Sequence, residues 1–217
     1  MPKKNISGNA YGLTLLCPIT NGSRDNRSYA GILRDYLENL PVEGQSPMAK
    51  VPNTYLARFY VLNDVFYEGS PVKEEHLKSK YLVFSSNFHG DRDTYVRGMW
   101  EADEAAVKAI WQYCVAFDEV HTAEDFIDYV KKCQVDNSLF FNGSTDDSLA
   151  EQLKGLYLKQ EFTYFAYENQ GLSAEELQKN FKEFVRRTQP SNLDEPSWSP
   201  GVPADKPRPM TVISPSL

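Results

Sequence analysis

The sequence predicts an α+β fold in which helices cover one face of a single antiparallel sheet. Segments with the two-residue period of strands alternate with segments that have the period of helices. Two of the strand segments follow each other with only a loop between them, which favours an antiparallel pair. The chain has 217 residues, of which 41% are hydrophobic, so it can form one domain with a core and an appendage.

The first half of the chain supplies one strand, one helix and two further strands. The apolar run at 10–20 leads into an Asn-Gly-Ser turn and predicts a strand. Residues 26–41 carry apolar side chains at helical spacing, and the proline at the end of this range ends the helix. Residues 53–64 and 80–88 are rich in β-branched and aromatic residues and predict the second and third strands.

The second half is mostly helical. Helical spacing runs through 91–114 and 122–133, and a threonine that can cap opens the second of these segments. Two further helices are predicted at 146–170 and 173–188, and a capping box, Ser-x-x-Glu, opens the last. The short apolar segment 138–144 predicts a fourth strand.

This order of elements is the split βαβ arrangement of a ferredoxin-like sandwich, with one antiparallel sheet and helices on one face. We therefore expect a ferredoxin-like module at 1–145, a helical extension at 146–188 and an extended tail at 189–217. A single sheet of this kind leaves its other face uncovered, and the usual cover is a second copy of the module, from the same chain or from a dimer partner. The sequence shows no second set of strands. We expect a homodimer of the dimeric α/β-barrel type.

The tail differs in composition from the rest of the chain. It holds seven of the 13 prolines and shows no periodicity. Proline-rich segments are good docking ligands because they lose little conformational entropy on binding. Residues 190–217 are therefore a candidate docking segment for a protein partner.

Charge and composition exclude several classes of function. The net charge of −7 and the pI near 5.1 argue against binding to nucleic acid or to an anionic membrane surface. No run approaches the roughly 18 apolar residues of a membrane span, and the N-terminus has no apolar signal region. The three cysteines show no paired spacing and predict buried, reduced thiols in a cytoplasmic protein. The three scattered histidines do not have metal-site spacing.

Alternation along the strands predicts which side chains share the open face. Leu82, Phe84, Ser86 and Phe88 form the more apolar set of the third strand and should meet the helices. If Phe59 also packs under the helices, the opposite face carries a polar set that can bind a small molecule. Its predicted members are Arg58, Tyr60, Ser85 and Asn87, together with Thr14.

Each of these side chains also has a structural interpretation. Arg58 is either a clamp for an anionic group or one half of an ion pair. Asn87 and Asp91 can cap the following helix, which would explain short polar residues at a junction between strand and helix. His89 can be a loop residue, a general base or a haem ligand, and its ordinary pKa of about 6.5 suits proton transfer.

Three segments resemble a known family. YLARFYVLND, YLVFSSNFHGDRDTYV and AIWQYCVAFDE are similar to the dimeric ferredoxin-like module of a bacterial group associated with haem-dependent, dye-decolourising-type peroxidases. The resemblance covers about residues 10–145. The chain departs from that pattern at His89, where an acidic residue is expected, and at Tyr113, where a histidine is expected.

The resemblance implies two classes of function. In the first, the chain binds or converts an apolar or aromatic metabolite, as a peroxidase-like or monooxygenase-like oxidoreductase with haem as the candidate cofactor. Arg58, Tyr60, Ser85 and Asn87 would then bind the substrate and His89 would move a proton. In the second, the chain is a non-catalytic accessory protein that docks a partner through its tail. A concentration of aromatic residues at 157–167 fits a core or dimer surface, or the wall of a pocket.

Overall fold

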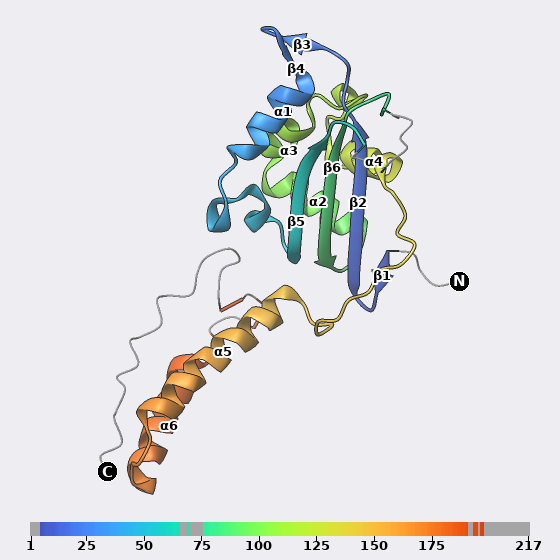
Figure 1. Cartoon of the computed structure of the whole chain (residues 1–217). Coiled ribbons are helices and arrows are strands. Elements are labelled where there is room, and N and C mark those ends of the chain that lie inside the picture. The colour runs from blue at the N-terminus through green and yellow to red at the C-terminus, as the bar shows by residue number, and fades with distance from the viewer. Residues whose placement is uncertain (1–4, 66–68, 70–75, 191–192, 195, 198–217) are drawn as a thin grey trace. The chain divides into compact units, whose positions relative to one another are not determined.

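The computed structural model describes residues 5–65, 69, 76–190, 193–194 and 196–197. The chain forms two compact units (Figure 1). One consists of residues 1–41 and 46–149, and the other of residues 42–45 and 150–217. Most of the proline-rich segment 190–217 lies outside the described residues, so its docking role stays a prediction.

The first unit is built on a four-stranded antiparallel sheet with the strand order β1-β2-β6-β5. Its long strands are β2 (Ala10–Pro18), β5 (Thr54–Leu62) and β6 (Tyr81–His89), and β6 lies between the other two (Figure 1). A bulge between Thr54 and Leu56 shifts the register at the start of β5. The α+β class with one antiparallel sheet is confirmed, and the arrangement is compatible with a ferredoxin-like fold.

The fourth strand is not the predicted one. Residues 138–144 form no strand, and the edge position beside β2 is taken by β1 (Ile6–Ser7) and by a short stretch at 134–137. That stretch makes a single antiparallel bridge, Leu15 to Gln134, and the amide of Val135 donates to the carbonyl of Thr14 at 2.9 Å. The prediction was wrong because the apolar pattern of 138–144 serves a different purpose, which is described below.

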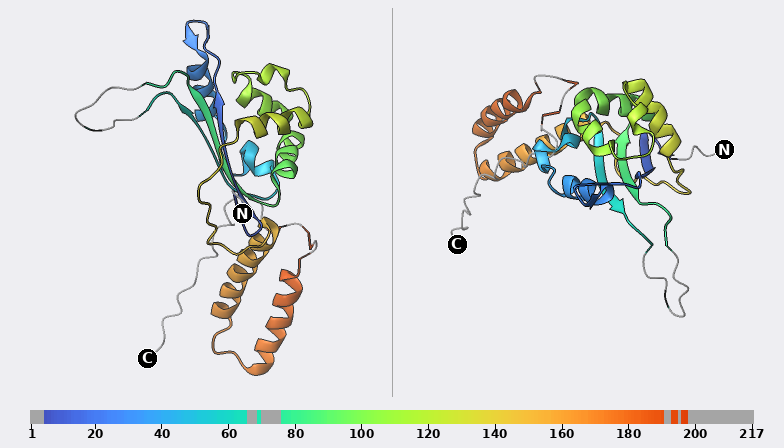
Figure 2. Two further views of the ribbon diagram at one scale, coloured as in Figure 1. Left: turned by 90° about the vertical axis from the view of Figure 1, so that its right-hand side faces the viewer. Right: turned by 90° about the horizontal axis from the view of Figure 1, so that it is seen from above.

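Helices cover one face of the sheet (Figure 2). They are α1 (Tyr29–Glu38), α2 (Arg92–Ala102), α3 (Glu104–Trp111) and α4 (Ala123–Cys133). The predicted long helix over 91–114 is divided at Asp103, whose side chain caps α3 by accepting from the amide of Ala106. A small hairpin, β3 (Ser23–Arg24) and β4 (Arg27–Ser28), precedes α1.

The core lies between these helices and the inward side chains of the sheet. Leu13, Leu15 and Cys17 of β2 are buried, and so are Leu82 and Phe84 of β6. Trp111 of α3 meets the rings of Phe59, Phe84 and Phe126 edge-on. The face predicted to meet the helices is therefore the face that they cover.

The second unit contains a hairpin of two helices, α5 (Leu149–Glu168) and α6 (Ala174–Thr188). Ser173 caps α6 through the predicted capping box with Glu176. The turn between the helices includes Gly171 at a φ of 75°, a conformation that residues with a Cβ rarely adopt. None of the helices in the described part of the chain has the length and apolar character to span a membrane.

Candidate functional site

The open face of the sheet brings the predicted site residues together in rows. Strand pairing aligns Thr14 of β2 with Ser85 of β6, and Ser85 with Arg58 of β5. A neighbouring row consists of Leu16, Val83 and Tyr60, and a third contains Gly12, Asn87 and Leu56. Adjacent strands lie about 4.8 Å apart, so each row is a continuous strip across the sheet. Figure 1 shows this face toward the viewer, with α2 and α4 behind it.

The open face combines apolar surface with a single guanidinium. The side chains of Leu56 and Tyr60 are 49% and 50% exposed, although both belong to residue types that favour burial. Arg58 lies between them along β5 and is exposed as well. An apolar strip with one central cation is suited to a molecule that has an apolar body and one anionic group.

The polar groups of this face are free to accept a ligand. Within the described residues, the guanidinium of Arg58 makes no ion pair and no hydrogen bond, so the alternative of a structural ion pair has no support there. In the same part of the chain, the side chains of Thr14, Tyr60, Ser85 and Asn87 form no hydrogen bonds. These side chains are exposed or partly exposed in one chain, so water and a ligand can both reach them.

Of the two residues predicted to cap the helix after β6, Asp91 does so and Asn87 does not. The carboxylate of Asp91 accepts from the amide of Thr94 at 2.9 Å and caps α2, as predicted. Asn87 does not cap this helix, because it lies inside β6, opposite Gly12 and Leu56. The capping role predicted for Asn87 is wrong.

His89 ends β6 at the far end of the open face, paired with Ala10. Four residues separate it from Ser85, which corresponds to roughly 13 Å along a strand. Arg58 and His89 therefore contact different ends of any ligand that touches both. The backbone amide of His89 donates to the carbonyl of Asn53, and the backbone amide of Gly90 donates to the carbonyl of Asn9.

A haem group does not fit these surroundings. Beside His89, the turn that contains Asn9 is polar, because the side chain of Asn9 donates to the carboxylate of Asp146 and its carbonyl accepts from the amide of Gly90. No step below depends on haem.

The ring of Phe140 covers Gly12 on the β2 side of the open face. The sequence did not predict this contact. A Cβ added to Gly12 would lie 2.7 Å from the ring of Phe140, so the ring covers the position where Gly12 has no side chain. Asn137 holds the segment in place by donating to the carbonyl of Gly12 at 3.1 Å. The apolar character of 138–144 thus supplies a ring to the sheet edge instead of a strand.

No protein-family model, curated protein or solved structure matches this chain. The family resemblance described above consequently stays an expectation.

A hollow of about 400 Å³ lies at the edge of β2, beside α4. Its lining includes Cys133 and Tyr129, and the thiols of Cys17 and Cys114 lie behind them. The neighbouring Cys114 thiol, together with burial, raises the pKa of Cys17 to about 12. The pKa of Cys133 is raised as well, mainly by its hydrogen bond with the Cys17 thiol and to a smaller extent by burial. The thiols of Cys17 and Cys133 are therefore protonated at neutral pH and are poor nucleophiles.

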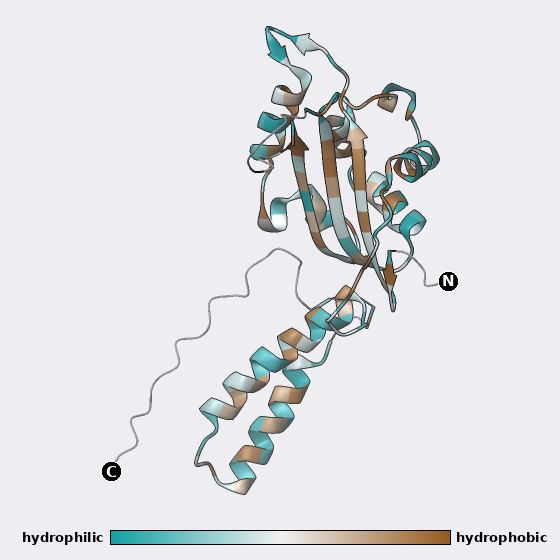
Figure 3. Cartoon of the chain, turned by 45° about the vertical axis from the view of Figure 1, so that its right-hand side comes forward, coloured by the Kyte–Doolittle hydropathy of each residue, from teal (hydrophilic) through white to brown (hydrophobic). Residues whose placement is uncertain are grey.

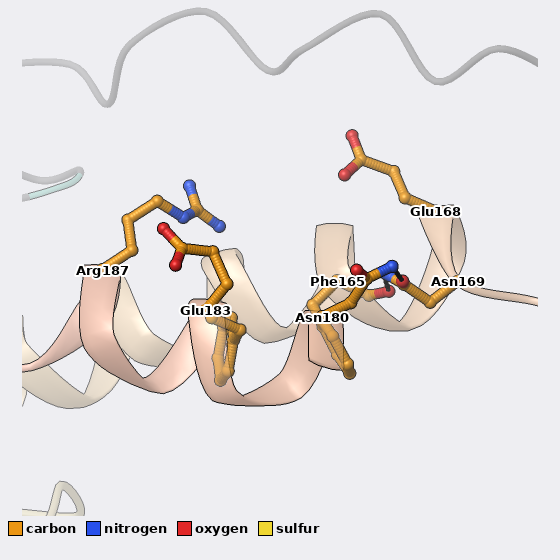
Figure 4. Close-up of a pocket in the computed structure, with 7 residues that line it drawn as sticks. Phe165, Glu168, Asn169, Asn180, Glu183 and Arg187 are labelled. Carbon is orange, nitrogen blue, oxygen red and sulfur yellow. Dashed lines mark hydrogen bonds between the residues drawn. The ribbon is translucent and has the colours of Figure 1, made fainter. Parts of the chain in front are cut away.

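Another hollow, of about 270 Å³, lies in the helical hairpin (Figure 4). Its polar groups bind one another: Asn180 donates to Asn169 at 2.6 Å, and Asn169 donates to the carbonyl of Phe165. Arg187, at the other end, pairs with Glu161 at 2.7 Å. These contacts join α5 to α6, so we interpret the groove as part of the hairpin. In the described part of the chain, no group of three or more His, Cys, Asp or Glu side chains is arranged to hold a metal ion.

Proposed function

We propose that the open face of the sheet binds a small molecule with an apolar or aromatic body and one anionic group, and that a second copy of the chain covers it. The observation that carries this proposal is Arg58, an exposed cation without an ion pair in the described residues, in the middle of an apolar strip. The dimeric α/β-barrel arrangement is the form in which such a sheet is covered.

Each residue has a role in this proposal. The Arg58 guanidinium binds the anionic group, with Ser85 and Thr14 as hydrogen-bonding neighbours in the same row. Leu56, Tyr60 and Phe140 contact the apolar body. Asn87 lies on the path from Arg58 to His89, which is the one candidate for proton transfer on this face. Whether a reaction follows depends on a ligand long enough to reach His89.

A pair of matched probes tests the binding step. Calorimetric titration would compare 2-naphthoate, which has an aromatic body and a carboxylate, with uncharged 2-naphthamide. We expect the carboxylate to bind more tightly, because a hydrogen bond to a charged group contributes about 1.5–3 kcal/mol, which is about 10- to 100-fold in Kd. Arg58→Leu should remove this difference, and Arg34→Leu, on α1, should retain it.

Two results would contradict the proposal. One is equal binding of the two probes by the unaltered chain. The other is a preference for the carboxylate that survives Arg58→Leu. Haemin added to the same samples gives an independent check, since a Soret band that disappears in His89→Ala would assign a cofactor to this face.

A further inference from the structure

The α5–α6 hairpin carries more apolar surface than two helices can bury between them. No residue of the 20-residue helix α5 is buried, and only Phe184 and Thr188 are buried in α6. Five large apolar side chains of the hairpin are between 41% and 50% exposed: Leu158, Phe162, Leu177, Phe181 and Val185. We call these five residues the apolar stripes.

The apolar stripes follow the repeat of a helix-packing surface. On α6, Leu177, Phe181 and Val185 are spaced four residues apart, and Leu158 and Phe162 have the same spacing on α5. The stripes meet in a cluster of rings, in which Phe162 contacts Phe184 and Phe181 contacts Phe165. Figure 3 shows apolar residues recurring along both helices. Exposed apolar surface of this extent marks an interaction site.

The charges of the hairpin indicate which partner fits. The half of the hairpin that lies far from the turn, residues 149–158 and 182–188, carries four cationic and two acidic side chains. The half near the turn, residues 159–168 and 174–181, carries two cationic and four acidic side chains. A second hairpin placed antiparallel to the first brings each basic half against an acidic half. The net charges of the two halves therefore favour an antiparallel second copy, although Arg187 and Glu161 pair within one hairpin.

We propose that two copies of the chain associate through their α5–α6 hairpins to form an antiparallel four-helix bundle. Such a pair has two-fold symmetry, so the same stripes serve both copies. Phe162 and Phe181 become part of the bundle core, as apolar side chains do at the facing positions of other bundles. This contact is distinct from the open face of the sheet, and neither proposal requires the other.

Hydrogen–deuterium exchange of the full-length chain at several concentrations tests the bundle without any substitution. Amides of 150–168 and 174–188 should exchange more slowly as the concentration rises, because the bundle suppresses opening of the helices. Exchange that does not depend on concentration contradicts the proposal. Slow exchange at every concentration would mean that the same chain covers the stripes, and fast exchange at every concentration that neither it nor a second copy does.

Paired substitutions provide the second arm. In the full-length variant Phe162→Lys, Phe181→Lys, amide exchange of the hairpin should no longer depend on protein concentration. The Kd for self-association through the hairpin should rise at least about tenfold. Phe141→Lys is the matched control, because Phe141 is 79% exposed but lies outside the hairpin, and it should behave as the unaltered chain does. Circular dichroism must show helices retained in both. Equal effects of the two variants would overturn the assignment of the stripes.

Loss of protection in the hairpin with unchanged 2-naphthoate binding would leave the sheet proposal intact. The reverse result, with the bundle present and no preference for the carboxylate, would remove the sheet proposal alone. The two proposals can therefore fail separately.

Discussion

Ser86 is a buried polar residue on the helix-facing side of β6, and its hydroxyl lies 2.8 Å from the hydroxyl of Tyr95. The hydroxyl of Thr54 lies 3.1 Å from the same group, so Tyr95 connects β5, β6 and α2. Burial raises the pKa of Tyr95, which keeps its hydroxyl protonated and able to donate. The ring also stacks on Phe88 with centroids 3.7 Å apart.

Tyr95→Phe should lower the free energy of unfolding by about 1–3 kcal/mol, because the ring stays in place while the hydroxyl of Ser86 loses its partner. Urea titration followed by circular dichroism measures this change. Tyr60→Phe is the control and should change stability by less than about 0.5 kcal/mol, since Tyr60 is half exposed and its hydroxyl has no described partner. Similar losses in both variants would contradict the assigned role of Tyr95.

At the scale of elements, the start of α2 depends on Asp91. Its carboxylate binds the hydroxyl and amide of Thr94, and these contacts hold the pKa of Asp91 below the ordinary 3.8. Because the pKa is lowered in the folded state, the stabilisation is complete above the ordinary pKa and is lost as the pH falls through the lowered value.

Asp91→Ala should cost about 1 kcal/mol at pH 7, the usual effect of removing an N-cap. The difference between the variant and the unaltered chain should shrink below about pH 3.8, the ordinary pKa of the carboxyl. Urea unfolding at pH 7, 5 and 3 measures it, with Asp118→Ala as an exposed control. A difference that is constant over this pH range would show that the carboxylate is not the capping group.

The connection after α4 is the other element whose role can be tested. Gly12→Ala should destabilise the chain by about 1–3 kcal/mol, because the new methyl group would overlap the ring of Phe140. In the double variant Gly12→Ala, Phe140→Ala, the space occupied by the ring is free, so the two costs should not add. Unfolding free energies of the four proteins give the coupling. Additive costs would mean that Phe140 does not cover Gly12.

These elements also show how far the sequence alone can predict this structure. The alternation of β6 assigned Ser85 and Asn87 to the open face correctly, because side-chain direction in a strand follows from local geometry. The capping box of α6 is similarly local. The edge of β2 was not predictable, since 134–137 pairs through a few contacts set by the position of α4. Phe140 and the division at Asp103 also depend on tertiary contacts that a single sequence does not display.

For the whole molecule, the proposed binding site requires that a second copy of the chain covers the open face of the sheet. Hydroxyl-radical footprinting of the full-length chain over a range of protein concentrations tests this directly. The oxidation of residues 54–62 is measured, because Leu56 and Tyr60 are half exposed in one chain. We expect their oxidation to slow as the concentration rises, and Leu56→Asp to abolish that protection while the fold is retained. Oxidation of Tyr60 at one constant rate, from dilute to concentrated protein, would contradict a covered face.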